Sequence, residues 1–289
     1  MTEYRQIGRT LARALDPRLT ALARAERQRA ELLSARLRPG AIAVVGPGAG
    51  TGRSTVAALL TSAFARHQGA GVLAVDTGQG GGLHARLAIR PGGSLQVVLA
   101  GLGLRDSAAG RRPAVGHRWL REQLALAERA MVLAAAPGDA DPPVGAAEYG
   151  VVATTLSRWF PLRVVDTPAL TEDPVVPAVL TRADRVVLVA SDDARGPESL
   201  AGCRSWISPL LREPLRRIGV QVLVRREPGP GVTAAPRPPT VPAEIATHVL
   251  PFDPALRGGG ALRWPDLAPD TREIVLEMAA QIVRDMRLK

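Results

Sequence analysis

The feature that most constrains this chain is a glycine-rich segment between an apolar stretch and an amphipathic one. Residues 41–45 read Ala-Ile-Ala-Val-Val, residues 46–55 read Gly-Pro-Gly-Ala-Gly-Thr-Gly-Arg-Ser-Thr, and residues 56–60 read Val-Ala-Ala-Leu-Leu. This order predicts a buried strand, a glycine-rich loop and the first turns of a helix. Backbone N–H groups converge at such a helix N-terminus, where the helix dipole also favours an anion. We therefore predict a phosphate-binding loop, with a plain strand-to-helix turn as the alternative.

The loop departs from the standard phosphate-loop pattern G-x-x-x-x-G-K-[ST] at two positions. Gly52 occupies the second glycine position and Ser54 the position of the magnesium-binding hydroxyl. Pro47 replaces the first glycine, and Arg53 replaces the lysine with a longer, planar cation. The residues expected to contact phosphate are Gly48, Ala49, Gly50, Thr51, Gly52, Arg53, Ser54 and Thr55.

Two aspartates at the ends of predicted strands complete the predicted site. Asp76 ends the apolar segment 71–76, and Asp166 ends the segment 162–166. Ligands of a parallel sheet bind at the carboxyl ends of its strands. Because magnesium prefers oxygen ligands, Ser54 and Asp166 are predicted to hold the metal, and Asp76 to orient a water or bind the metal through water. Asp76 and Asp166 are thus the candidate catalytic residues, with turn or helix capping as the alternative role.

From residue 39 onward, strand-like and helix-like segments alternate, which predicts an α/β fold. We expect three layers, with a mostly parallel sheet of about seven strands flanked by helices, in one domain over residues 39–289. The segments 78–116 and 226–242, rich in Gly, Pro and Arg, are expected to be loops. Strands are expected at 41–45, 71–76, 130–135, 162–166, 185–190, 219–224 and 247–250, and helices at 54–67, 118–128, 145–158, 174–182, 197–212 and 270–287.

Residues 1–38 are expected to form a basic helical arm with a break at Asp16-Pro17. A basic amphipathic helix can bind an anionic membrane, nucleic acid or an acidic partner. The favoured alternatives are an arm packed on its own domain and a short dimerising coil. The last helix, 270–287, is expected to be a core helix because its apolar face is broad, with membrane contact as the alternative.

Composition excludes several classes of function. The single Cys203 allows no internal disulfide, and four histidines without ligand spacing make a zinc site improbable. We expect a cytoplasmic protein, because no apolar run approaches the roughly 20 residues of a membrane span and residues 1–5 lack a signal-peptide core.

The formal net charge is +10, but the basic residues are almost all arginine, an expected consequence of a GC-rich genome. This charge therefore argues only weakly for nucleic-acid binding.

These motifs together resemble the MinD/ParA branch of phosphate-loop ATPases. The family pattern K-G-G-x-G-K-[ST]-T matches residues 48–55 with both lysines replaced, by Gly48 and Arg53. Asp76-Thr-Gly78 is similar to the first switch motif with its first acid kept, and residues 164–168 resemble the second. The segment 220–225 lacks the asparagine that reads adenine in the family. Residues 182–196 and 249–254 look most similar to actinobacterial MinD-like proteins associated with type VII (ESX) secretion.

The resemblance implies ATP or ADP with Mg²⁺ as cofactors, homodimerisation, and protein partners in a secretion or positioning machinery. It also implies a cytoplasmic protein that can lie peripherally at the inner face of the membrane. With the lysines replaced, we expect nucleotide binding to be kept or weakened and hydrolysis to be slow or absent. The alternatives are a pseudo-ATPase scaffold that binds no nucleotide and a non-specific DNA-binding protein of the partition type.

Overall fold

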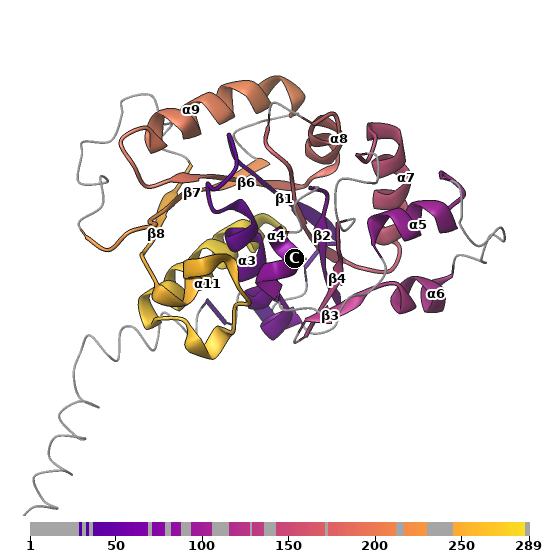
Figure 1. The fold of residues 1–289 in the computed structure, drawn as a ribbon, viewed down its shortest axis with the longest axis horizontal. Coiled ribbons are helices and arrows are strands. Elements are labelled where there is room, and N and C mark those ends of the chain that lie inside the picture. The colour runs from indigo at the N-terminus through magenta and orange to yellow at the C-terminus, as the bar shows by residue number, and fades with distance from the viewer. Residues whose placement is uncertain are drawn as a thin grey trace, which may run out of the picture.

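In the part of the chain that the structure describes, eight strands form one sheet with helices on both faces (Figure 1). The computed structural model describes residues 29–30, 33–34, 37–68, 71–78, 82–87, 94–105, 116–127, 129–135, 143–170, 173–211, 217–229 and 245–286. Residues 1–28 of the expected arm and 230–242 of an expected loop lie outside the described residues. The strands are β1 (Gly40–Val45), β2 (Val72–Asp76), β3 (Ala125–Ala127), β4 (Ala130–Leu133), β5 (Leu162–Asp166), β6 (Arg185–Ser191), β7 (Ile218–Val224) and β8 (Thr247–Leu250).

The strand order is β3-β4-β2-β5-β1-β6-β7-β8, and the described strands pair in parallel except at β3–β4. The seven predicted strands are all present, so the expected parallel sheet is confirmed. The eighth strand, β3, was expected to be part of a helix over 118–128. That helix ends at Glu122, and the following Ala-Leu-Ala forms a hairpin with β4 in which Ala125 and Ala127 are buried and Leu126 is exposed.

The helices form the outer two layers. The α-helices are α3 (Arg53–Gln68), α4 (Gly82–Leu87), α5 (Leu95–Gly101), α6 (His117–Glu122), α7 (Ala146–Ser157), α8 (Val175–Arg182), α9 (Gly196–Ile207) and α11 (Pro269–Val283). Short 3₁₀ helices are η2 (Ser208–Leu210), η4 (Pro254–Gly259), η5 (Trp264–Asp266) and η6 (Arg284–Met286).

Alternate residues of the central strands face two separate cores. Ile42 and Val44 of β1 pack with α3, α4 and α11, whereas Ala43 and Val45 pack with α5, α7, α8 and α9. Figure 1 shows these two helix layers on opposite sides of the sheet. The two-sided burial explains why the central strands read as continuous apolar runs.

Two helices occur where loops were expected. α4 and α5 lie within the segment 78–116, which was predicted to be a loop because it is rich in glycine and proline. The apolar patterns of the two helices are too short to outweigh that signal. Leu83 and Leu87 of α4 pack into the core beside α3, and Leu95, Val98 and Leu99 of α5 pack against the opposite face. Tertiary packing therefore overrides weak local propensity in both helices.

The last helix packs within the protein. Val275, Met278, Ala279 and Ile282 of α11 are fully buried against β7, β8 and α3, as expected for a core helix. Among the described residues of the expected arm, Leu33 is also buried in this core. Arg29 forms an ion pair with Glu273 of α11 at 3.0 Å. The described end of the arm thus packs on the domain.

Candidate functional site

The glycine-rich segment forms a tight loop between β1 and α3. Gly50 and Gly52 have positive φ angles of 73° and 93°, a conformation that favours glycine. A Cβ on Gly52 would approach the side chain of Val224 to 3.0 Å, so glycine also permits close contact with β7. The Thr51 hydroxyl donates to the carbonyl of Gly48 at 3.1 Å, and the N–H of Val56 donates to Gly52 at 2.9 Å as the helix begins.

Arg53 and Gly48, which replace the two lysines of the MinD/ParA loop pattern, have different surroundings. Arg53 lies against the loop, where its Nη1 donates to the carbonyl oxygen of Gly46 at 3.4 Å. Gly48 borders open space, because a Cβ built there meets no described atom within 4 Å. The loop therefore keeps one cation and leaves an empty position at the second.

The predicted carboxylates are brought together. Asp76 and Asp166 are register partners at the ends of the adjacent strands β2 and β5. Both are nearly inaccessible, with exposed fractions of 2% and 3%. Asp76 Oδ1 accepts a hydrogen bond from the N–H of Gly78 at 3.0 Å, and Asp166 accepts one from the Ser54 side chain.

Burial makes both carboxyl groups reluctant to ionise. Burial, together with the nearby charge of Asp76, raises the pKa of Asp166 to about 8, although Ser54 and Arg53 pull it down. Burial raises the pKa of Asp76 to about 6, against the opposing effect of backbone N–H groups of Gly78, Leu83 and His84 and the charge of Arg53. The latter two N–H groups belong to the first turn of α4, so this unpredicted helix helps to hold Asp76.

Backbone contacts fix the strand ends that carry these carboxylates. The N–H and hydroxyl of Thr77 donate to the carbonyl oxygen of Asp166 at 3.0 and 2.8 Å. The Thr167 hydroxyl donates to the carbonyl of Val44 at 3.0 Å. These contacts hold β1, β2 and β5 in a single arrangement at the edge that bears the loop.

A cavity of about 990 Å³ lies beside the loop. The loop residues 50–55 form one part of its lining, and residues of α4 together with the segments at the ends of β6, β7 and β8 form the rest. Residues on these walls that the sequence did not single out include Arg86, Asp192, Arg225, Arg226, Phe252 and Arg257. Asp192 lies just after the predicted strand 185–190. Its position at the carboxyl end of a strand, the signal that identified Asp76 and Asp166, could therefore have identified it too.

Some of the charged groups in this wall have structural partners. Arg225 Nε donates to the buried carboxylate of Asp192 at 2.9 Å, which joins the ends of β6 and β7. Arg86 Nη1 donates to the carbonyl of Leu256 at 2.9 Å and so ties α4 to η4. The wall residues come from distant parts of the sequence and meet only in the folded chain.

The donor set fits a hard divalent cation beside phosphate. The buried oxygens Asp76 Oδ2 and Asp166 Oδ1 have no hydrogen-bond partner in the part of the chain that the structure describes. Ser54 supplies a hydroxyl next to Asp166, and a Cβ on Gly82 would come within 2.7 Å of that hydroxyl, which leaves no room for a larger residue. Carboxylate and hydroxyl oxygens are ligands that Mg²⁺ accepts.

The other candidate groups are placed elsewhere. No cluster of three or more His, Cys, Asp or Glu residues suited to a metal ion occurs among the described residues. Cys203 is buried in α9, where burial raises the pKa of its thiol to about 11. No described helix is both long and apolar enough to cross a membrane.

Comparison with known proteins identifies similar folds. No protein-family model matches the chain. The cell division ATPase MinD of Pyrococcus furiosus superposes with a TM-score of 0.61 at 19% identity, over 85% of this chain and 99% of that one. An ATP complex of McdA from Cyanothece gives a TM-score of 0.59 at 16% identity, over 88% and 99% of the two chains. A ParA family ATPase from Chlorobium tepidum gives 0.55 at 14% identity, over 86% and 92%.

Comparison with curated proteins finds a similarity in sequence as well. The ESX-1 secretion-associated protein EspI of Mycobacterium tuberculosis is 26% identical over 259 residues. The alignment covers 84% of this chain and 36% of EspI, so the chain spans about a third of the length of the curated relative it matches.

Proposed function

Because the chain has the fold of the MinD/ParA phosphate-loop ATPases, we propose that it binds a magnesium–nucleotide complex and regulates a protein assembly through that binding. The single observation that carries the proposal is the pair of buried carboxylates, Asp76 and Asp166, beside Ser54 at the mouth of the phosphate loop. Two buried carboxyl groups with unpartnered oxygens destabilise a fold unless a cation or a proton accompanies them.

The proposed roles follow the positions of the residues. Backbone N–H groups of residues 48–55 and the Arg53 guanidinium would hold the phosphates of ATP or ADP, aided by the α3 dipole. Ser54 and Asp166 would hold Mg²⁺, which neutralises phosphate charge when bound. Asp76 would orient a water molecule or contact the metal through water.

We propose that hydrolysis is slow or absent. Transition-state stabilisation depends on where positive charge sits, and Gly48 offers no charge to a partner subunit. Arg53 places its cation on a longer arm than lysine and donates to Gly46 within its own loop. The observation at Gly48 also supports the second candidate function, a pseudo-ATPase scaffold that acts through protein contacts alone.

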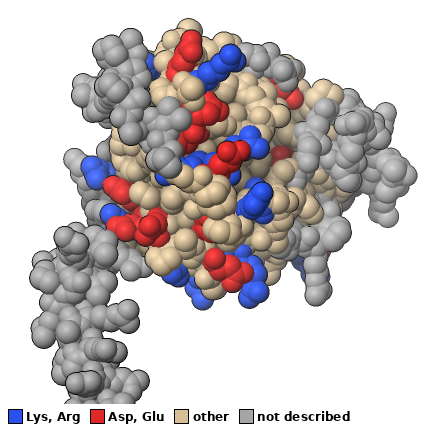
Figure 2. Space-filling view, turned by 60° about the vertical axis from the view of Figure 1, so that its left-hand side comes forward, with Lys and Arg blue, Asp and Glu red and all other residues tan. Residues whose placement is uncertain are grey.

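The proposed setting is a secretion assembly, in the cytoplasm. The secretion-associated name of EspI supports this proposal. The proposed partners are the machinery's own proteins and a second copy of this chain. On the face that Figure 2 displays, the distribution of charge gives little support to DNA binding. Figure 2 shows Lys or Arg and Asp or Glu side chains interspersed on the face it displays, rather than one continuous basic area among the described residues.

Calorimetric titration with ATP and ADP tests the proposal. We expect micromolar binding with Mg²⁺, and about a tenfold loss of affinity in Ser54→Ala that disappears when EDTA replaces the metal. The exposed Ser205→Ala on α9 is the matched control and should bind as the wild type does. Absence of binding in the wild type would favour the scaffold, and unchanged affinity in Ser54→Ala would remove the proposed metal site.

A further inference from the structure

A charged residue occupies an inward-facing position in the middle of the sheet. Arg163 is the second residue of β5, a strand with β1 and β2 on either side. It lies on the same face of the strand as the fully buried Val165, and only 9% of Arg163 is exposed. An arginine at such a position is unusual, because a buried guanidinium needs a partner to offset its lost hydration.

The protein supplies only part of that compensation. Arg163 Nη1 donates to the carbonyl of Phe160 at 2.6 Å. Asp184 is the nearby carboxylate that favours the charged form, but its Oδ2 accepts a hydrogen bond from the N–H of Ala41 at 2.8 Å. Within the described residues, Arg163 forms no ion pair within 4.0 Å. Burial accordingly lowers the pKa of Arg163.

A second guanidinium reaches the same place from another helix. Arg182, the last residue of α8, passes over α7 at Gly150, where a Cβ would come within 2.7 Å of Arg182 Nη2. Glycine inside a helix lowers helix stability by about 1 kcal/mol relative to alanine. At this position the absence of a side chain leaves room for the Arg182 guanidinium. Arg182 Nη1 makes a long contact of 3.3 Å to the carbonyl of Ala178.

A tyrosine hydroxyl completes the group. Tyr149 of α7 is only 3% exposed, and among the described residues its hydroxyl makes no hydrogen bond. Burial raises the pKa of Tyr149 to about 12, although the charges of Arg163 and Arg182 oppose this rise. The hydroxyl therefore keeps its proton at physiological pH and can donate it in a hydrogen bond.

These three side chains line a cavity of about 200 Å³ between α7 and the sheet. Thr154 and Ser157 also line it, but their hydroxyls donate to backbone carbonyls of Gly150 and Thr154 at 2.9 and 2.8 Å. Those two hydroxyl oxygens can therefore only accept further hydrogen bonds. The cavity is smaller than the roughly 300–1,000 Å³ of pockets for drug-sized ligands, so its ligand must be small.

We propose that this cavity is a second binding site, separate from the phosphate loop, for a small phosphate-type oxyanion. The guanidiniums of Arg163 and Arg182 and the Tyr149 hydroxyl donate to the anion, in the charge-assisted geometry that arginine forms with phosphate. Monohydrogen phosphate matches the walls, because its one O–H can donate to Thr154 or Ser157. A bound anion also supplies the countercharge that Arg163 lacks.

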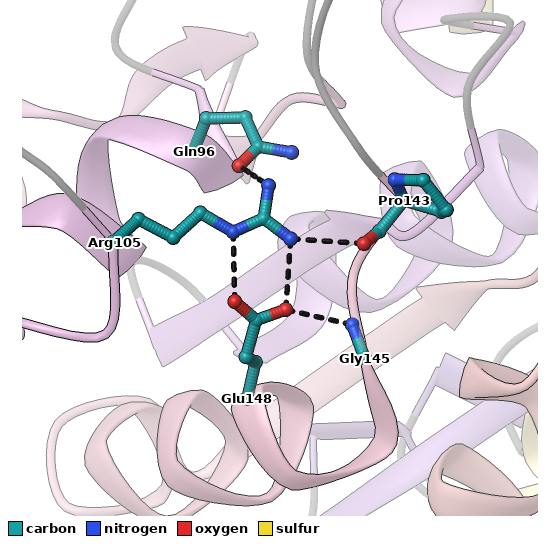
Figure 3. Close-up of polar contacts among 5 residues, drawn as sticks. All are labelled: Gln96, Arg105, Pro143, Gly145 and Glu148. Atoms are coloured by element: carbon teal, nitrogen blue, oxygen red, sulfur yellow. Dashed lines mark hydrogen bonds and ion pairs between the residues drawn. The ribbon is translucent and has the colours of Figure 1, made fainter.

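The helix that carries the tyrosine is held firmly in place. Arg105, which follows α5, donates from Nε and Nη2 to the two carboxylate oxygens of Glu148 at 2.7 and 2.8 Å (Figure 3). Glu148 Oε2 also accepts the N–H of Gly145 at 2.7 Å, which closes the first turn of α7. Tyr149 is the next residue, so this turn presents its ring to the cavity in one orientation.

Titration of inorganic phosphate into the full chain tests the site. Binding is measured by calorimetry and by the rise in melting temperature. We expect Tyr149→Phe and Arg182→Ala each to weaken phosphate binding at least tenfold. Arg158→Ala, an exposed arginine just after α7, is the matched control and should leave binding unchanged. Arg53→Ala should also leave this binding event intact, because it alters only the phosphate loop.

Several results would overturn the proposal. One is the absence of phosphate binding to the wild type, and another is full affinity in both Tyr149→Phe and Arg182→Ala. Loss of all phosphate binding in Arg53→Ala would place the anion in the phosphate loop instead. Because Tyr149→Phe removes one oxygen atom only, circular dichroism and melting of the unliganded variant can establish that it is folded.

Discussion

At the scale of single residues, Asp166 is needed ionised for the proposed magnesium site, but its burial in the unliganded protein disfavours the ionised form. An unfolded aspartate is ionised above its ordinary pKa of 3.8, whereas folded Asp166 keeps its proton up to about pH 8. Unfolding therefore releases a proton between these values, and the free energy of unfolding falls as pH rises through this window.

We accordingly expect Asp166→Asn to stabilise the ligand-free protein while it weakens magnesium-dependent nucleotide binding. At pH 8 its free energy of unfolding should exceed that of the wild type by about 1–3 kcal/mol, the range for relieving an unsatisfied buried group. Urea unfolding at pH 6 and pH 8 measures the difference, which should be larger at the higher pH. A variant less stable than the wild type at both pH values would contradict this expectation; the exposed Asp193→Asn is the control.

At the scale of secondary-structure elements, Arg105 and Glu148 join the end of α5 to the start of α7 (Figure 3). Besides the paired contacts to Glu148, Arg105 donates to the side chain of Gln96 and to the carbonyl of Pro143, the latter at 2.9 Å. Both partners of the ion pair are largely buried, with side-chain exposures of 17% and 23%. Removal of either partner leaves the other group underpaired.

Arg105→Ala should therefore lower the free energy of unfolding by about 1–3 kcal/mol at pH 7. Hydrogen bonds from Arg105 are the main cause that holds the pKa of Glu148 below its ordinary value. This contribution is present above the ordinary pKa of 4.5 and is lost as pH falls through the lower folded value, so the two proteins should converge in acid. Chemical denaturation at pH 7 and pH 3 measures this difference in the free energy of unfolding.

The control is Arg118→Ala, which removes a solvent-exposed ion pair with Glu122 and should change the free energy of unfolding little. An equal loss of stability in both variants would contradict the prediction.

The sequence predicted elements well where one local signal dominated. Apolar runs rich in β-branched residues predicted the seven parallel strands, and the glycine-rich loop and both strand-end aspartates lie together as the parallel topology requires. The short β3, α4 and α5 were missed because tertiary packing, rather than local propensity, stabilises them. Arg225 and Asp192 were not predicted to meet, because their contact depends on the pairing of β6 with β7.

At the scale of the whole molecule, the open position at Gly48 predicts how copies of the chain respond to nucleotide. Wild-type protein offers no cation there, so we expect ATP to change its sedimentation little. Gly48→Lys should increase ATP-dependent self-association, because a Cβ at this glycine meets nothing within 4 Å and its φ angle is not positive. Analytical ultracentrifugation with and without ATP measures this.

The matched control is Gly202→Lys, at an exposed glycine on α9 that also has open space around its Cβ position. It adds the same charge away from the loop and should not make association depend on ATP. Strong ATP-dependent dimerisation of the wild type, or an equal effect of both lysines, would show that the vacancy at Gly48 does not govern assembly.

The central strand β5 carries buried groups of opposite charge near its two ends. It begins beside a buried cation, Arg163, and ends in a buried acid, Asp166, three residues further on, or about 10 Å at the usual strand rise. Above about pH 8, where Asp166 is ionised as well, the two side chains form an electric dipole along the strand, positive near its amino end and negative at its carboxyl end. Under that condition each end attracts ions of the opposite sign, anions near Arg163 and cations near Asp166.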